Sequence, residues 1–436
     1  MKAAEKISQK LENYTKRKDD LKIKDWRFGL AEGCEISLGL DKGEIGGPYL
    51  PPSTNDVFQG SAYVIWADDS VSIIDMDAKS LEDLDLVLKE GKLSSYVDPD
   101  SPDILEPQTL PSDLKIKDEK VADLINKDNS YFFEVLEFYK DQLGQKPYAK
   151  NIEAEVGASL AKSNLMNSKG LNVSWESTSM STGAIVNDKF WDFYSKRNLC
   201  EKKDLNRIVN EIDRFMMHID NPMKMKSGKM KVILAPDTLG AFFGKYIAGE
   251  ILEGGSIAEN QSLYTVEDFL NKRKIFDERI NLVVNGLKDY DNGTVPCSGE
   301  GVPATKQYLI AEGRLITPML GLKYAKKIGM EPTPPGSLKL EVADKMPYSG
   351  MLKGIDYGLI VYGVLGMHTQ DSKTGRYGLA VSEGLLVEDG KVKGTVKDVV
   401  IAGNFFDALN DKKTKFAKYR ADEIAMRLES TVKARD

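Results

Sequence analysis

Beyond residue 280 the sequence is a succession of short apolar segments, and this pattern constrains the fold more than any other feature. The segments predict strands at 280–284, 357–364, 378–387 and 399–402. Two hairpins are predicted as well, one turning at Glu312-Gly313 and one at Asp389-Gly390. Short strands joined by tight turns pair with their neighbours in sequence. We therefore expect a largely antiparallel, β-rich C-terminal domain, shaped as a barrel or a sandwich.

The first half of the chain mixes helical and strand patterns. Apolar residues at helical spacing predict helices at 2–18, 119–126, 130–143, 203–219 and 238–252. Alternating patterns predict strands at 35–40, 62–77 and 231–235, and a hairpin that turns at residues 167–170. A capping box at Ser80 is expected to open one more helix. The fold class predicted from both halves is α+β, with an N-terminal mixed α/β domain whose strands are covered by helices.

A stretch rich in proline and acidic residues divides the sequence. VDPDSPDILEPQTLPSD contains four prolines, which disfavour helix and remove hydrogen-bond donors from a sheet. We interpret residues 99–118 as a linker. The predicted organisation is an N-terminal α/β region at 1–98, the linker, a helical and hairpin region at 119–230, and a β-rich domain at 231–436.

Composition excludes several functional classes. The net charge of −7 provides no positive field for a nucleic-acid backbone. No apolar run reaches the roughly 18 residues that span a bilayer, and the N-terminal segment lacks the apolar core of a signal peptide. The cysteines, Cys34, Cys200 and Cys297, are too few and too far apart for a disulfide framework. A cytoplasmic protein without a nucleic-acid or membrane partner is expected.

The sequence offers few residues for catalysis. It contains two histidines and none of the GxSxG, GxxxxGK[ST] or HExxH motifs of common hydrolases, nucleotidases and zinc proteases. His368 follows an apolar strand, where a general base can stand at the edge of a cleft, with Asp371 or Glu300 as acidic partners. The other interpretation of His368 is a loop histidine bonded to a local carbonyl group. Both stay open, and no catalytic residue is assigned.

Several stretches between about residue 155 and residue 411 resemble the TldD/PmbA (TldD/TldE) family. LMNSKGLNVSWESTSMSTGAIV is similar to a family hairpin, SGKMKVILAP to a family strand, and GEGVPATKQYLIAEGRLITPML to a third family segment. Just before the third segment, Cys297-Ser298-Gly299-Glu300 departs from the usual acidic pair. The most specific match is YGLIVYGVLGMHTQDSKTGRYGLAVSEGLLVEDGKVKGTVKDVVIAGNFFDAL, where an ordered set of glycines recurs with a Thr-Gly pair.

The resemblance implies a zinc-dependent peptidase that acts on peptides and unfolded segments. Such peptidases are built from two related subunits, and older names call them modulators of DNA gyrase. One subunit carries an HExxxH helix and a distal cysteine, and the other lacks both. Alignment with that helix puts Gly244, Lys245 and Gly249 at the positions of the two histidines and the glutamate. The distal cysteine segment is expected to be missing as well, since only 25 residues follow Asp411. Their segment KFAKYRADEIAMRLESTVKARD contains no cysteine and is predicted to be a charged helix.

This chain thus resembles the TldE/PmbA type. The resemblance implies that the chain itself holds no metal and that zinc is bound only by a TldD-type partner. A TldD-type catalytic subunit or a second copy is the expected partner, and a peptide the expected substrate. Glycines at 244 and 249 each cost a helix about 1 kcal/mol relative to alanine, so they indicate that another backbone comes close. That backbone belongs either to a partner or to this chain. Two alternatives stay open: a self-sufficient hydrolase with a site around His368, and a non-enzymatic homodimeric peptide-binding protein.

Overall fold

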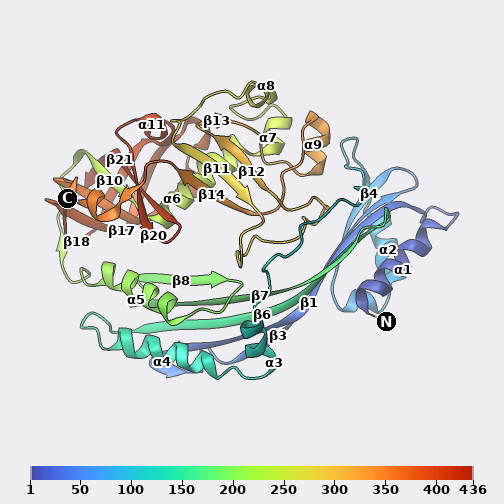
Figure 1. The fold of residues 1–436 in the computed structure, drawn as a ribbon, viewed down its shortest axis with the longest axis horizontal. Coiled ribbons are helices and arrows are strands. Elements are labelled where there is room, and N and C mark those ends of the chain that lie inside the picture. The colour runs from blue at the N-terminus through green and yellow to red at the C-terminus, as the bar shows by residue number, and fades with distance from the viewer. Residues whose placement is uncertain (1, 435–436) are drawn as a thin grey trace. The chain divides into compact units, whose positions relative to one another are not determined.

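The computed structural model describes residues 2–434, which form two compact units (Figure 1). Unit 1 comprises residues 1–210, 285–306 and 321–337, and unit 2 comprises residues 211–284, 307–320 and 338–436. The chain therefore returns twice to unit 1 after it has entered unit 2. The predicted domain boundaries describe a division along the sequence and remain predictions.

Unit 1 is built on a long antiparallel sheet. Its strands are β1 (Ile23–Asp41), β2 (Glu44–Ile45), β3 (Ser53–Trp66), β4 (Ser70–Met76), β5 (Tyr96–Val97), β6 (Ile152–Asn167), β7 (Asn172–Val186) and β8 (Phe190–Lys196). They are ordered β5-β4-β3-β1-β6-β7-β8, and β2 pairs with β1. The predicted hairpin at 167–170 joins β6 to β7. The glycine- and proline-rich segment 43–56 contains β2 and the start of β3.

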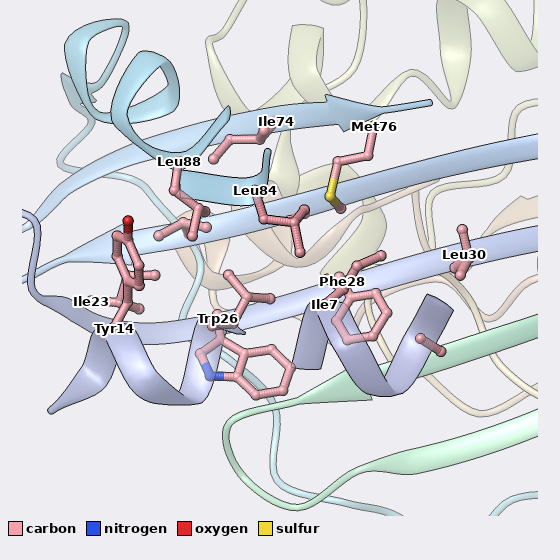
Figure 2. Packing of buried hydrophobic residues seen from close by; sticks show 14 of the residues in the cluster. Ile7, Tyr14, Ile23, Trp26, Phe28, Leu30, Ile74, Met76, Leu84 and Leu88 are labelled. Atoms are coloured by element: carbon pink, nitrogen blue, oxygen red, sulfur yellow. The ribbon is translucent and has the colours of Figure 1, made fainter. Parts of the chain in front are cut away.

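Helices cover this sheet because the strands alternate apolar and polar side chains. The helices are α1 (Ala3–Thr15), η1 (Lys79–Leu81), α2 (Leu84–Leu93), α3 (Glu119–Asn126), α4 (Ser130–Gly144) and α9 (Leu322–Ile328), and α5 (Lys202–Met216) crosses from unit 1 into unit 2. Figure 2 shows Ile7 and Tyr14 of α1, Leu88 of α2, and Trp26 and Phe28 of β1 within one buried apolar cluster. This cluster is the core at one end of the sheet.

The predicted cap at Ser80 is wrong in detail. Ser80 belongs to the short turn η1, where its hydroxyl and its backbone N–H both donate to Asp77. The helix α2 begins later, and its N-cap is Asp83, whose carboxylate accepts a hydrogen bond from the N–H of Leu86. Both Ser and Asp suit an N-cap, so the residue types alone could not decide between them.

The acidic stretch 99–118 has no helix before Asp118, as its prolines predict. Carboxylates at its start form ion pairs with α9: Lys323 with Asp98, just before the stretch, at 2.7 Å, Lys327 with Asp100 at 2.8 Å and Lys326 with Asp103 at 3.0 Å. These three ion pairs attach the turn at Asp98–Ser101 and the residues after it to α9.

Unit 2 contains a closed barrel of five strands. These are β10 (Gly228–Leu234), β16 (Tyr357–Leu365), β17 (Arg376–Glu388), β19 (Val399–Asn404) and β21 (Glu423–Ala434). Each pairs with the next, and β19 closes the ring by pairing with both β17 and β21. Only the β10–β16 pair in the ring is parallel. The predicted α+β class, with a largely antiparallel and barrel-like C-terminal part, is confirmed.

Smaller elements surround the barrel. The strands β9 (Pro222–Met223), β15 (Met346–Pro347), β18 (Lys391–Val396) and β20 (Lys415–Arg420) extend its sheet. A second sheet has the order β13-β12-β11-β14, from β11 (Ile280–Asn285), β12 (Lys306–Ala311), β13 (Arg314–Leu315) and β14 (Ser337–Val342). The helical elements are α6 (Pro236–Phe242), η2 (Phe243–Ile251), α7 (Gly254–Ala258), α8 (Val266–Leu270), α10 (Tyr348–Lys353), η3 (Met367–Thr369), η4 (Ser372–Thr374) and α11 (Phe405–Asn410).

The charged helix predicted after residue 414 is wrong, because the segment forms β20 and β21. From Met426 onward in β21, Met426, Leu428, Ser430 and Val432 are buried, whereas Arg427, Glu429 and Thr431 between them are not. This period of two is the pattern of a strand with one face in a core. The density of charge hid the alternation. Within residues 2–434, none of the helices combines the length and apolar character that a bilayer crossing requires.

Candidate functional site

The segment that aligns with the zinc-binding helix of the family follows β10 directly. Pro236 occupies the first helical turn of α6, where its missing N–H costs nothing. From Phe243 the segment continues as the π-helix η2. Phe242 and Tyr246 are fully buried with their rings stacked at 5.7 Å, and the Tyr246 hydroxyl donates to the carbonyl of Arg376 at 2.9 Å. These aromatic contacts hold the helix on the barrel.

A π-helix pairs each residue with the one five positions on, and π-turns are frequent at functional sites. Residues 244 and 249 are five apart, so η2 stacks them on one side. A Cβ atom added to Gly249 would lie 3.1 Å from the carbonyl oxygen of Gly244. The helix therefore has a geometry that aligns the two positions where the family resemblance expects histidines.

The side chains at these positions do not fit a metal ion. Gly244 and Gly249 supply no donor atom, and the ammonium group of Lys245 repels a cation. Across residues 2–434, no group of three or more histidine, cysteine, aspartate or glutamate side chains is arranged to hold a metal. We derive no chemical step through zinc in this chain.

A cavity of about 530 Å³ lies along the helix within unit 2. Gly240, Phe243 and Gly244 form one wall, and residues 338–340 of β14 and Ile424 form others. A Cβ atom added to Gly240 or to Gly244 would meet nothing within 4 Å. A tight contact inside this chain, one of the two explanations for glycine in this helix, is therefore absent at Gly244.

The predicted residues His368 and Asp371 lie in the two short turns η3 and η4. Ser372, next to Asp371, donates through its hydroxyl to Glu250 of η2 at 2.7 Å, and Glu250 is 9% exposed. The Asp371 carboxylate accepts a hydrogen bond from the N–H of Lys373 at 3.1 Å and so caps its own turn. The structure thus attaches the His368 segment to the π-helix.

Glu300, the third predicted candidate, belongs to unit 1 and is engaged there. One carboxylate oxygen lies 3.3 Å from a guanidinium nitrogen of Arg27, and the other accepts the N–H of Leu322 at 2.9 Å. Leu322 is the first residue of α9, so Glu300 also stabilises the positive end of that helix. These contacts give Glu300 a structural role in unit 1.

The sequence interpretation missed Glu250 and Ser372. Both lie inside stretches that carry the family resemblance, but neither belongs to a motif with known chemistry. A glutamate among Tyr246, Ile247 and Ile251 on a helix was the available signal, because a buried carboxylate needs a hydrogen-bond donor.

Comparison with known proteins agrees with the resemblance. The profile of the PmbA/TldA metallopeptidase C-terminal domain matches residues 227–420. A zinc metalloprotease TldD homolog of Saccharolobus solfataricus is 25% identical over 223 residues, which are 48% of this chain and 48% of that protein. Metalloprotease PmbA of Escherichia coli O157:H7 is 27% identical over 194 residues, 43% of this chain and 41% of that protein. The matched stretch therefore spans about half the length of these curated relatives.

The fold is also that of a solved relative. The crystal structure of TldE from Thermococcus kodakarensis superposes with a TM-score of 0.77 at 19% identity, covering 100% of both chains. The family resemblance seen in the sequence is confirmed by these comparisons. Residues 227–420 of this chain match the PmbA/TldA metallopeptidase C-terminal domain, and the chain as a whole resembles the TldD/PmbA family.

Proposed function

We propose that this chain is a TldE/PmbA-type member of its family, which binds polypeptide and assembles with a zinc-bearing TldD-type subunit without holding a metal itself. The observation that carries the proposal is the π-helix with Gly244, Lys245 and Gly249 at the positions of the HExxxH ligands and base. A catalytic zinc site needs three protein ligands, and this helix contributes none.

The open surface of the same helix supports a role in binding. Gly240 and Gly244 leave the helix backbone uncovered beside the cavity of about 530 Å³. Glycine destabilises a helix relative to alanine, but it lets another backbone approach the helix closely. A polypeptide from a partner subunit or from a substrate would occupy this space.

The first test is the metal content and peptidase activity of the purified chain. We expect far less than one zinc per chain by mass spectrometry, and no cleavage of unfolded casein. The TldD homolog of Saccharolobus solfataricus, purified and assayed in parallel, is the positive control. One zinc per chain together with activity that a chelator removes would refute the metal-free assignment.

The second test concerns assembly. A tagged chain is used to capture proteins from its native lysate, and the proposal expects a relative that carries HExxxH. Replacing Gly244 by leucine fills the open surface and should reduce the recovery of that relative, whereas Glu35→Gln, an exposed change in unit 1, should not. Recovery of this chain alone would favour the homodimeric peptide-binding alternative.

A self-sufficient hydrolase around His368 is the second candidate. The hydrogen bond from Ser372 to Glu250 supports it, since this bond joins the His368 turns to the family's functional helix. In that case His368→Ala should abolish cleavage by the purified chain and leave the melting temperature nearly unchanged. Cleavage that survives the substitution rules this candidate out.

A further inference from the structure

The outer end of the long sheet in unit 1 carries two exposed aromatic side chains. Trp191 and Phe193 of β8 are 55% and 45% exposed, and their rings stack at 5.2 Å with an interplanar angle of 23°. Trp191 and Phe193 are two residues apart on one strand, so both point to the same face of the sheet. Stacked aromatic rings left open to solvent at the edge of a sheet are typical of a surface that binds something.

The register of the neighbouring strands puts two carboxylates on that face. One row across the strands runs from Glu155 of β6 through Gly183 of β7 to Phe193 of β8. The next row runs from Glu153 through Ile185 to Trp191. Adjacent strands lie about 4.8 Å apart, so the carboxylate row is roughly 10 Å from the aromatic row. Glu155 is exposed, and the Glu153 carboxylate accepts one hydrogen bond from the side-chain amide of Asn151 at 3.2 Å.

Between Phe193 and Glu155 the floor has no side chain, because Gly183 occupies that position, whereas Ile185 stands between Trp191 and Glu153. A Cβ atom added to Gly183 would lie 2.8 Å from the carbonyl oxygen of Asp192 and 2.9 Å from the Cβ of Phe193, so only glycine fits there. A cavity of about 360 Å³ opens over this floor, with Leu50 at its far side. The result is a notch with an aromatic wall, a glycine floor and an acidic wall, which we call the β8 notch.

We propose that the β8 notch binds an arginine-bearing extended segment of another polypeptide. The aliphatic stem would lie over Gly183, and the guanidinium group would stack on Phe193 and Trp191 while it donates to Glu155 and Glu153. A planar guanidinium suits an aromatic face better than an ammonium does, and it can bind a carboxylate through two hydrogen bonds. β8 is the last strand of its sheet, but the Phe193 carbonyl already accepts a hydrogen bond from Arg207 at 2.6 Å, so the side chains of the notch rather than the strand edge provide the binding groups.

This site lies wholly in unit 1 and does not depend on the proposed function of the helix at 236–251. The opposite face of the same strands is closed, since Asp192 and Tyr194 are buried and Asp192 pairs with Arg207 at 3.0 Å. Substitutions confined to the notch can therefore remove its chemistry without disturbing the core beneath it.

The test uses blocked, fluorescein-labelled hexapeptides, Ac-VRVRVR-NH2 and Ac-VQVQVQ-NH2, titrated with the full chain and followed by fluorescence anisotropy. The arginine peptide should bind at least about tenfold more tightly than the glutamine peptide, because it adds both ionic and cation–π contacts. The double variant E153Q/E155Q should lose most of that difference. The control variant E35Q removes one carboxylate charge at an exposed position of β1 and should keep the difference in affinity between the two peptides.

Replacing the aromatic wall gives an independent readout. The variant W191S/F193S should weaken both peptides, since both use the apolar surface, while circular dichroism stays that of the native chain. Equal affinity for the two peptides would overturn the proposal, as would an E35Q variant that loses as much as E153Q/E155Q. Sedimentation that shows a dimer, which W191S/F193S dissociates and which binds neither peptide, would assign the notch to a second copy instead.

Discussion

Replacing Gly244 by alanine separates two reasons for having glycine in the π-helix. If the glycine served the packing of the chain itself, the added methyl group would clash and the protein would lose stability. The structure leaves nothing within 4 Å of the new Cβ, so we expect the opposite. Alanine should stabilise the isolated chain, and any loss should appear only when a partner or peptide has to come close.

The magnitude follows from helix propensity. Glycine inside a helix costs about 0.8–1.0 kcal/mol relative to alanine, and G244A should recover roughly that much. For a unit of 150–250 residues, about 1 kcal/mol shifts the melting temperature by about 2–4 °C. G249A should gain less, because its Cβ would lie only 3.1 Å from the Gly244 carbonyl oxygen. We therefore expect G244A to be the most stable of the three proteins. G249A should be slightly more stable than the wild type or equal to it.

Differential scanning calorimetry measures this order, with Gly254→Ala as the matched control in the same unit. A Cβ at residue 254 would lie 2.1 Å from the carbonyl oxygen of Met319, so G254A should be destabilised by about 1–3 kcal/mol. A G244A variant that melts several degrees below wild type would refute the reasoning, since it would mean that the space beside Gly244 is filled in the folded chain.

Two further predictions concern buried polar groups. Burial raises the pKa of the Cys200 thiol to about 12 and that of Cys297 to about 11, so both stay neutral at pH 8 and should react with Ellman's reagent far more slowly than the partly exposed Cys34. Both pKa values in the folded chain lie above the usual value for a thiol. The stability that the neutral thiols contribute is therefore present below about pH 8.5 and is lost as the pH rises toward 11–12. Urea titrations across that pH range can follow the loss. Glu211 is 6% exposed, accepts a hydrogen bond from the Tyr419 hydroxyl and lies 3.2 Å from Arg214 and 3.7 Å from Arg420. Tyr419→Phe removes the hydroxyl and should cost about 1–3 kcal/mol in a urea titration. An unchanged midpoint would show that the two arginine contacts suffice.

Much of the fold could be predicted because strand and helix periodicities were strong. The helix at 119–126 was predicted with its observed bounds, and both hairpin turns contain residues with positive φ, as Glu312 and Asp389 show. The closure of the barrel could not be predicted. It depends on the pairing of β19 with β21, and a period of two says which side chains share a face but not which strands are neighbours.

The candidate site was predictable only in part. The family resemblance located the helix and the positions 244, 245 and 249, and a weak histidine signal pointed to a turn that the structure attaches to that helix through Ser372. The π-turn could not be predicted, since its hydrogen bonds differ from those of an α-helix by one residue and leave no composition signal. The contacts of Glu300 with Arg27 and with the first N–H of α9 could not be predicted, because a carboxylate in a glycine-rich loop suits a helix end and an active site equally well in sequence.

The closed barrel also has a consequence for the order of folding. β10 ends at Leu234 and pairs with β21, which begins at Glu423, so one seam joins segments that are almost as far apart as the unit allows. Such contacts form late, because the loop entropy has to be overcome before the pair contributes stability. During synthesis β10, β16, β17 and β19 are made before β21, and the exposed edges of β10 and β19 would meanwhile be open to pairing with other chains. Unit 2 is therefore the part of the protein for which a chaperone would matter most.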